Sequence, residues 1–211
     1  MDLQNLFVIA IGSIFINNFI FSRFLGTCPY IGVSKQLDSA VGMGVAVTFV
    51  LTMASAVTWL SYAYFLAPNE SNLFYRIFAL NTPPDLSFLR TITFILVIAA
   101  LVQFVEMVIQ KSSPSLYKAL GIYLPLITTN CVILGVALLN VEESFTFIES
   151  VVHGLSAGIG FTLALVLMAG IREKLDLADV PKAMRGVPIA FIMAGLMAIA
   201  FLGFAGLKLG Q

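Results

Sequence analysis

Two stretches of the sequence decide the fold: Leu25-Gly26-Thr27-Cys28-Pro29 and Leu124-Pro125-Leu126-Ile127-Thr128-Thr129-Asn130-Cys131. Each lies in an apolar segment and carries one of the two cysteines of the chain. Glycine and proline weaken the hydrogen-bond ladder of a helix. In a lipid bilayer, freed backbone groups are tolerated only where protein or a cavity covers them. The two stretches therefore predict two broken or distorted helices that face each other in the core.

The composition places the chain in a membrane. Of its 211 residues, 60% are hydrophobic and only 10% are charged, and the mean hydropathy is +1.01. Soluble domains carry about 25% charged residues, so this chain could not cover a water-facing surface. No polar stretch is long enough to fold separately, which predicts one lipid-embedded domain over residues 1–211. A net charge of zero provides no basic surface for nucleic acid.

Six apolar segments predict an all-α integral membrane protein with six transmembrane helices. Each segment is long enough to cross about 30 Å of hydrocarbon. An even number of helices puts both termini on one side of the membrane. Eight of the eleven Lys and Arg residues follow the first, third and fifth segments, which predicts cytoplasmic odd-numbered loops and external termini. The segments are about 3–24, 39–66, 87–109, 118–139, 148–171 and 187–207.

A faint internal repeat divides the chain near residue 105. Val41-Gly42-Met43-Gly44 resembles Ala157-Gly158-Ile159-Gly160, and Leu25-Gly26 resembles Leu134-Gly135. Three helices per repeat make the second repeat run upside down, so the halves, about 1–105 and 106–211, would be inverted repeats. Sites in such proteins lie near the membrane midplane on discontinuous helices. Chance recurrence of Gly-x-Gly in glycine-rich membrane helices explains the same pattern.

Cys28 and Cys131 are the first candidates for chemistry. Thiolates bind iron–sulfur clusters, copper and zinc. A [2Fe–2S] or [4Fe–4S] cluster conventionally takes four cysteines, and this chain offers two, so a cluster here needs two more from another polypeptide. Two other interpretations remain open, namely buried thiols that only pack and a disulfide.

Polar residues within the apolar segments are candidates for an ion pathway. The carboxylate of Glu106 is costly inside a bilayer and suits a proton or a sodium ion. Alternatively, it lies near the cytoplasmic end of its helix and pairs with Lys111. The single histidine, His153, is interpreted as a hydrogen-bonded residue near the outer interface rather than a metal ligand. The remaining candidates either bind a cation or join neighbouring helices; they are Asn17, Asn18, Thr128, Thr129 and Asn130.

Several motifs, spread over nearly the whole chain, resemble one family of membrane subunits. They are Ile16-Asn17-Asn18-Phe19, Phe24-Leu25-Gly26-Thr27-Cys28-Pro29, Gly32-Val33-Ser34-Lys35, Gln103-Phe104-Val105-Glu106-Met107, the stretch 120–131 and Ala178-Asp179-Val180-Pro181. They are similar to the paired six-helix subunits of the Rnf complex and of the sodium-translocating NADH:quinone reductase. Within that family they resemble the A-type subunit of Rnf most.

The resemblance implies a role in electron transfer. In this family two subunits, the A-type and the E-type in Rnf, are inserted in opposite orientations around one intramembrane [2Fe–2S] cluster, and each supplies two cysteines. Carried over to this chain, the iron ligands are Cys28 and Cys131, and an E-type partner supplies the other two. The Rnf complex moves electrons between ferredoxin and NAD⁺ and couples this to Na⁺ or H⁺ translocation, with flavins and other clusters held by its B, C, D and G subunits.

The same resemblance implies a subunit of a redox-driven translocase that is not catalytic alone, in a bacterial or archaeal cytoplasmic membrane. Three other functions fit parts of the sequence. The outer segment 68–87 ends in Asp85-Leu86-Ser87, which is similar to the E-type subunit of the quinone reductase. An iron-free secondary transporter with inverted repeats could bind a solute at four of the polar groups, those of Asn17, Asn18, Thr128 and Asn130. A structural subunit would need neither the thiols nor those polar groups.

Overall fold

The computed structural model of the chain describes residues 3–67, 87–112 and 124–206, which form helices and short connections without a β-strand. The prediction of an all-helical protein is confirmed for this part of the chain. The outer segment, apart from its last residue, and the first part of the motif at 120–131 lie outside the described residues. The elements are α1 (Leu3–Ile11), the π-helical turn η1 (Gly12–Ile16), α2 (Phe19–Arg23), α3 (Thr27–Val33), α4 (Leu37–Ser61), the π-helical turn η2 (Tyr62–Leu66), η3 (Ser87–Leu89), α6 (Arg90–Ser112), α8 (Leu124–Thr128), α9 (Cys131–Glu142), α10 (Phe147–Asp176), α11 (Val187–Leu202) and η4 (Gly203–Gly206).

Four helical stretches of the described chain are long and apolar enough to cross a membrane. They are Leu37–Leu66, Arg90–Val108, Pro125–Glu142 and Phe147–Asp176, and they correspond to the second to fifth predicted segments. The first and last segments contain shorter apolar helices, Gln4–Ile16 and Val187–Leu202. These two helices are therefore shorter than the predicted segments, and the described chain shows four stretches of membrane-crossing length rather than six. The first helix ends early because the backbone leaves the helical conformation at Asn17, with φ −105° and ψ 42°.

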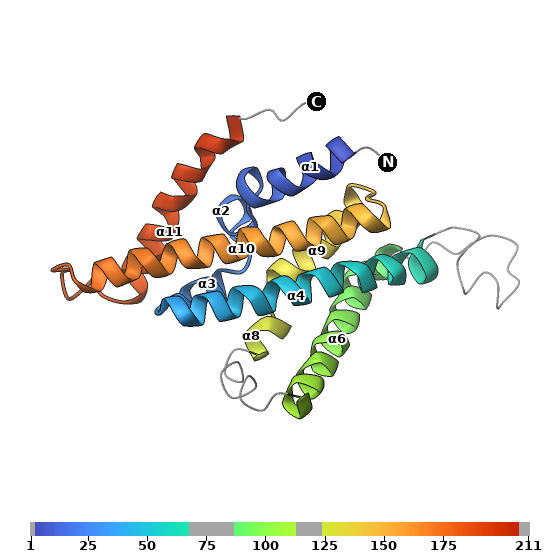
Figure 1. The fold of residues 1–211 in the computed structure, drawn as a ribbon, viewed down its shortest axis with the longest axis horizontal. Helices are drawn as coiled ribbons and strands as arrows, with labels where there is room; N and C mark the ends of the chain where they lie inside the picture. The colour runs from blue at the N-terminus through green and yellow to red at the C-terminus, as the bar shows by residue number, and fades with distance from the viewer. Residues whose placement is uncertain (1–2, 68–86, 113–123, 207–211) are drawn as a thin grey trace, which may run out of the picture.

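The long helices α4 and α10 form the centre of the fold and run antiparallel (Figure 1). Small residues allow close approach, because Gly44 of α4 lies against Thr162 of α10, and Gly158 of α10 lies against Thr48 of α4. The two threonine Oγ1 atoms meet at 3.2 Å, 114 residues apart in the sequence. The glycine of each helix thus faces the threonine of the other, so Gly44 and Gly158 occupy equivalent positions in the two halves of the chain. The sequence repeat aligned Gly44 with Gly160, two residues away from this register.

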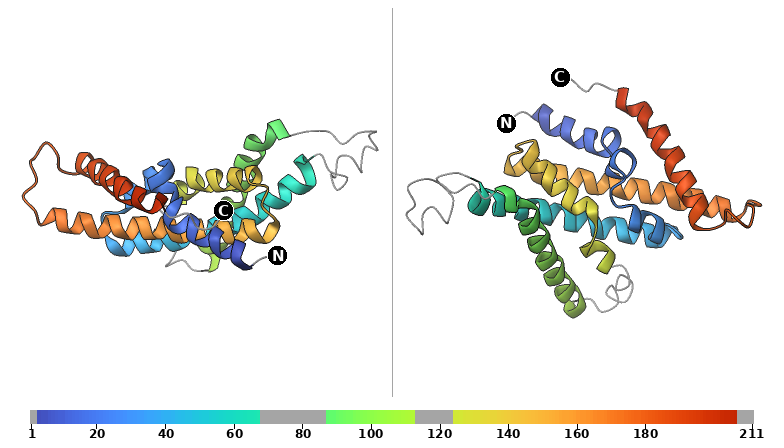
Figure 2. Two further views of the ribbon diagram at one scale, coloured as in Figure 1. Left: turned by 90° about the horizontal axis from the view of Figure 1, so that it is seen from above. Right: turned by 180° about the vertical axis from the view of Figure 1, so that it is seen from behind.

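The other helices pack around the central pair, and the two halves of the chain interlock (Figure 2). Helix α1 and η1 of the first half pack on α10, whereas α9 of the second half packs on α4. Helix α11 packs on α2, and α6 lies against α4, α8 and α9. Each half therefore covers the long helix of the other, and the fully buried side chains, including Tyr30, Met43 and Phe161, come from both halves.

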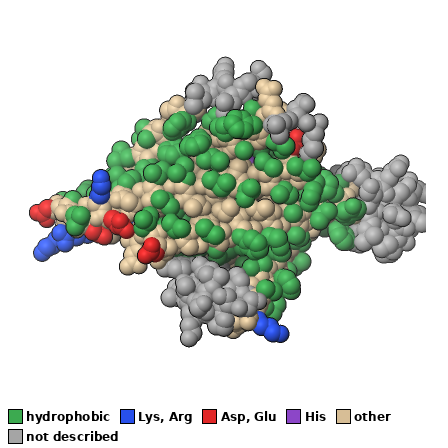
Figure 3. Space-filling view, viewed as in Figure 1, with side chains coloured by type: hydrophobic (Ala, Val, Ile, Leu, Met, Phe, Trp, Pro, Cys, Tyr) green, Lys and Arg blue, Asp and Glu red, His purple; other side chains and the backbone are tan. Residues whose placement is uncertain are grey.

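The outer surface is apolar. Hydrophobic side chains are spread over the face seen in Figure 3, and charged side chains gather at the tip formed by the C-terminal end of α10. The exposed large side chains include Ile92, Leu96, Phe191 and Ile199. Large exposed apolar areas of this kind mark membrane or protein contacts. The surface therefore suits lipid and membrane-embedded partners.

Alanine in place of Gly158 is expected to destabilise the fold, because its Cβ would lie 2.6 Å from the Cα of Thr48 on the facing helix. A backbone atom cannot rotate away, so α4 and α10 must separate, at a cost of about 1–3 kcal/mol. Unfolding in detergent, followed by circular dichroism, measures this loss. Gly170→Ala on the same helix is the control, since nothing lies within 4 Å of its new Cβ. Equal stability of the two variants would contradict the close packing of α4 on α10.

Candidate functional site

Asparagine side chains build both helix breaks. The Oδ1 atom of Asn18 accepts a hydrogen bond from the N–H of Ile20 at 3.1 Å and so caps α2. In the same way, Oδ1 of Asn130 accepts from the N–H of Val132 at 3.1 Å and caps α9. An asparagine cap satisfies a backbone donor that no helix carbonyl can reach. The two breaks therefore have the same local design in the two halves of the chain.

The prediction of broken helices at the cysteine stretches is confirmed, but the role given to proline is not. Pro29 lies in the first turn of α3, where a missing N–H costs nothing, and Pro125 lies in the first described turn of α8. The chain reverses instead at Phe24 and Gly26, which have left-handed φ values of 53° and 76°. Glycine adopts this conformation without strain. Gly26 thus interrupts its helix, as the sequence predicted. The asparagine caps, rather than the prolines, form the other part of the breaks.

One hydrogen bond joins the two cysteine stretches. The backbone N–H of Gly26 donates to Sγ of Cys131 over 2.9 Å, although 105 residues separate them. Cys28 lies two residues after Gly26, in the first turn of α3, and Cys131 is the first residue of α9. Both thiols are free and exposed on this chain. The interpretation of two buried packing thiols is therefore wrong, and so is a disulfide within the chain.

The side-chain amides of the two capping asparagines differ. The Nδ2 atom of Asn18 donates to the carbonyl oxygens of Gly160 at 2.8 Å and Ile14 at 3.1 Å. The Nδ2 atom of Asn130 is buried and has no acceptor among the described residues. Buried amide groups normally find partners. Asn130, which directly precedes Cys131, therefore has a buried side-chain donor that no acceptor among the described residues uses.

The other predicted ion-pathway residues are not all part of this arrangement. Asn17 is exposed at the end of η1, and Thr128 is partly buried at the end of α8. Thr129 is exposed and donates to the carbonyl oxygen of Pro125 at 2.9 Å. Glu106 is half-buried on α6, and within the described chain no ion pair links it to Lys111. The structure thus brings Asn18, Asn130 and Cys131 to the breaks and leaves Glu106 on a neighbouring helix.

Two polar contacts near the site were not predicted. Arg172, near the end of α10, donates to the carbonyl oxygen of Ile31 at 2.7 Å and to Ser34 at 3.1 Å, and so holds the C-terminal end of α3. A positive charge there also complements the negative end of a helix. Within the bundle, His153 is buried and its Nδ1 lies 2.6 Å from Oδ1 of Asn140, so the expected hydrogen bond of this histidine is present, with a partner that was not predicted. Spacing along the sequence gives no signal for either contact.

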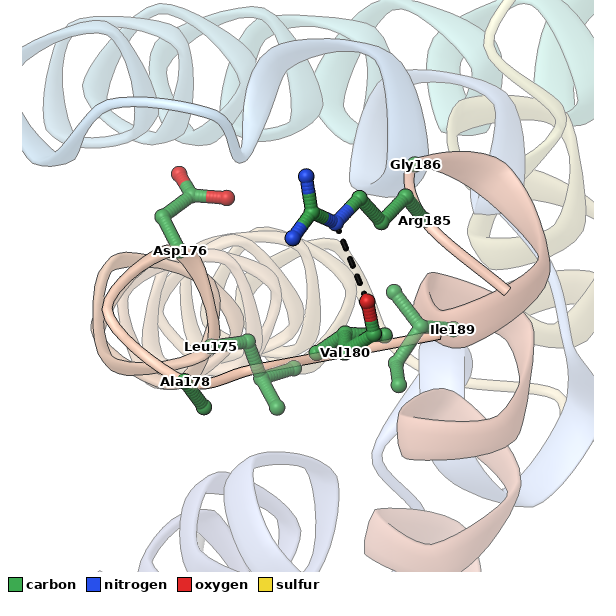
Figure 4. Close-up of a pocket in the computed structure, with 7 residues that line it drawn as sticks. All are labelled: Leu175, Asp176, Ala178, Val180, Arg185, Gly186 and Ile189. Carbon is green, nitrogen blue, oxygen red and sulfur yellow. Dashed lines mark hydrogen bonds between the residues drawn. The ribbon is translucent and has the colours of Figure 1, made fainter. Parts of the chain in front are cut away.

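A shallow pocket of about 170 Å³ lies between the end of α10 and the start of α11 (Figure 4). Arg185 crosses it and donates from Nε to the carbonyl oxygen of Val180 at 3.0 Å. Its guanidinium also pairs with the exposed Asp179 at 3.7 Å. No predicted site residue lines this pocket.

The two cysteines are suited to a metal–sulfur group, for which this chain alone could supply only part of the ligands. Among the described residues, no three His, Cys, Asp or Glu side chains come together to hold a metal ion. Two exposed thiols at the N-terminal ends of helices and an N–H on one sulfur suit the negative charge of an iron–sulfur group. They provide two of the four thiolates that such a group takes.

Comparison with known proteins gives a consistent result over the whole chain. A family model described as "Rnf-Nqr subunit, membrane protein" matches residues 6–208. The A subunit of the Na(+)-translocating ferredoxin:NAD(+) oxidoreductase complex of Acetobacterium woodii is 58% identical over 207 residues, which cover 98% of this chain and all of that protein. The A subunit of the ion-translocating oxidoreductase complex of Syntrophotalea carbinolica is 52% identical, over 99% of this chain and all of that protein. The corresponding protein of an Azoarcus species is 54% identical, over 95% of this chain and 96% of its own length.

Proposed function

The chain belongs to the Rnf-Nqr family of membrane subunits, and on that premise we propose that it is the A-type subunit of an ion-translocating ferredoxin:NAD⁺ oxidoreductase. It relays electrons through the membrane interior, and the complex couples this transfer to Na⁺ or H⁺ translocation. The observation that carries the proposal is the pair of free, exposed cysteines whose stretches the Gly26–Cys131 hydrogen bond joins. The names of the relatives support the A-type subunit of this complex over the E-type subunit of the quinone reductase.

In this proposal Cys28 and Cys131 bind the irons of a [2Fe–2S] cluster, and an E-type partner completes it with two further cysteines. The cluster supplies one-electron transfer. The exposure of both thiols allows a partner to reach them. The helix breaks put the positive ends of α3 and α9 next to the thiolates, where they stabilise negative charge. The B, C, D and G subunits of the complex would carry the electrons to and from this pair.

We place the chain in the cytoplasmic membrane with six membrane passes, of which the first and fourth are interrupted at the asparagine caps. The inverted repeats, about 1–105 and 106–211, then correspond to the reciprocal contact of α4 and α10. The excess of basic residues in the odd-numbered loops supports external termini. The apolar outer surface supports the lipid contacts that this topology needs.

Ion coupling would use the polar groups of the breaks and the carboxylate of α6. Added negative charge attracts a cation far more strongly in a low-dielectric interior than in water. Glu106, half-buried without an ion pair among the described residues, could neutralise Na⁺ or carry H⁺ within the membrane. The oxygens of Asn17, Asn18, Thr128 and Asn130 would line the route. Uptake of the cation would follow electron arrival and favour opening of one repeat against the other.

The proposal is tested by measuring the iron and sulfide content of the chain purified together with its E-type partner. The chain is co-expressed with its E-type partner and purified in detergent, and the chain alone is purified as the control. About two iron and two acid-labile sulfide per pair are expected, with none on the chain alone, because two cysteines cannot hold the cluster. An iron-free pair would refute the proposal. If that pair moved a solute across vesicles without ferredoxin, the secondary transporter would be the function.

A further inference from the structure

We propose that the backbone N–H of Gly26 raises the reduction potential of the iron–sulfur group that Cys131 would bind, which makes Gly26 a positioning residue for electron transfer. This inference rests on the proposed function. It concerns a residue that is neither a metal ligand nor a charged group. Its basis is the hydrogen bond of 2.9 Å from the N–H of Gly26 to Sγ of Cys131.

The position of this N–H depends on glycine. Gly26 has φ +76°, and a Cβ there would lie 2.6 Å from Cγ2 of Val132 and 2.9 Å from a ring carbon of Phe161. A side chain at this position would be strained by the backbone conformation and would push the loop away from α9. The absence of a side chain at Gly26 is therefore what lets its N–H reach the sulfur of Cys131.

The direction of the effect follows from charge. Reduction adds one electron, delivered from ferredoxin in the proposed function, and no bond forms or breaks. The added negative charge is shared with the ligand sulfurs, so a donor on the sulfur of Cys131 stabilises the reduced state more than the oxidised one. Hydrogen bonds to sulfur are one of the ways in which proteins set the potential of such groups. The low dielectric of a membrane interior strengthens the effect.

The two cysteines of the chain differ in this respect. Sγ of Cys131 accepts the Gly26 N–H, whereas Sγ of Cys28 accepts no hydrogen bond from the described residues. The effect is therefore assigned to the Cys131 side of the group. The change in reduction potential does not come from a charged side chain, since Gly26 has no side chain.

The experiment is a redox titration of the purified complex, followed by low-temperature EPR, for the native protein, Gly26→Ala and Gly32→Ala. Reduction is expected to become about tenfold less favourable in Gly26→Ala, a shift of about 59 mV to lower potential for one electron. Gly32→Ala is the control, because Gly32 is an exposed residue of α3 with nothing within 4 Å of its new Cβ. An unchanged potential in Gly26→Ala, with the cluster retained, would overturn the inference.

A second variant protects the test against misfolding. Gly26→Ala combined with Val132→Ala removes the closest obstruction at 2.6 Å, whereas φ +76° and the ring carbon of Phe161 at 2.9 Å still displace the loop, so this variant is expected to keep the cluster with a lowered potential. If neither variant assembles, pulsed EPR of the native complex with ¹⁵N-labelled glycine decides. A ¹⁵N coupling to the reduced cluster supports the inference, and its absence refutes it. A native complex without any cluster would instead refute the proposed function, so the two failures are distinguishable.

Discussion

Alanine in place of Cys131 or Cys28 is expected to lower ferredoxin-dependent NAD⁺ reduction by the complex at least about 100-fold. Loss of partners outside the first coordination sphere typically costs 10–100-fold, and a lost ligand costs more. A cluster with three thiolates would not survive purification, so its EPR signal and its iron should disappear in both variants. Ion uptake into vesicles should fall with the electron flow, since the two are coupled.

The same variants should fold normally, because both thiols are exposed on the chain and their removal opens no cavity. Thiol loss at Cys28 breaks no hydrogen bond to the described residues, so its unfolding temperature should match that of the native chain. Thr27→Ala, at the neighbouring position, is the control that should keep both cluster and activity. Normal activity with a full cluster signal in either cysteine variant would remove that thiol from the ligand set.

The sequence predicted the helical class and the position of the two breaks, because apolar length and the glycine of the first cysteine stretch are local properties. It overestimated the first and last helices. The first helix ends at the turn at Asn17, and α11 begins at Val187 as predicted but ends at Leu202, where the turn η4 follows. Hydropathy averages over such single-residue turns. It also assigned the breaks to proline, whereas asparagine caps form them, since proline is harmless in a first helical turn.

Contacts between distant segments could not be predicted from the sequence. Gly26 and Cys131 are 105 residues apart, and Arg172 reaches Ile31 across 141 residues. Neither pair follows a helical or strand period. The faint sequence repeat aligned Gly44 with Gly160 and made no statement about packing, because each motif has two glycines; the contact between Thr48 and Thr162 instead pairs Gly44 with Gly158. Position in space, rather than residue type, decides which candidates share a site.

Asn18→Ala is expected to affect mainly stability and Asn130→Ala mainly electron transfer, although both variants remove a helix cap. Loss of Asn18 removes three hydrogen bonds, two of them to the carbonyl oxygens of Gly160 and Ile14. Buried groups left without partners cost about 1–3 kcal/mol each, so the free energy of unfolding should fall by about 2–4 kcal/mol. Loss of Asn130 removes one cap, worth about 1 kcal/mol, and also removes a buried donor that has no acceptor among the described residues.

The effects of the two variants on electron transfer should have the reverse order, with the larger loss in Asn130→Ala. Asn130 directly precedes Cys131, and its buried amide has no acceptor among the described residues, so Asn130→Ala should slow electron transfer about tenfold with the cluster retained. Asn18→Ala should lower the yield of assembled complex but leave the activity per cluster unchanged. SDS unfolding in mixed micelles and activity per EPR-detected cluster measure the two effects separately. If both variants lost stability and activity in the same proportion, the amide of Asn130 would have a structural role only, because the cap is the one feature that the two residues share.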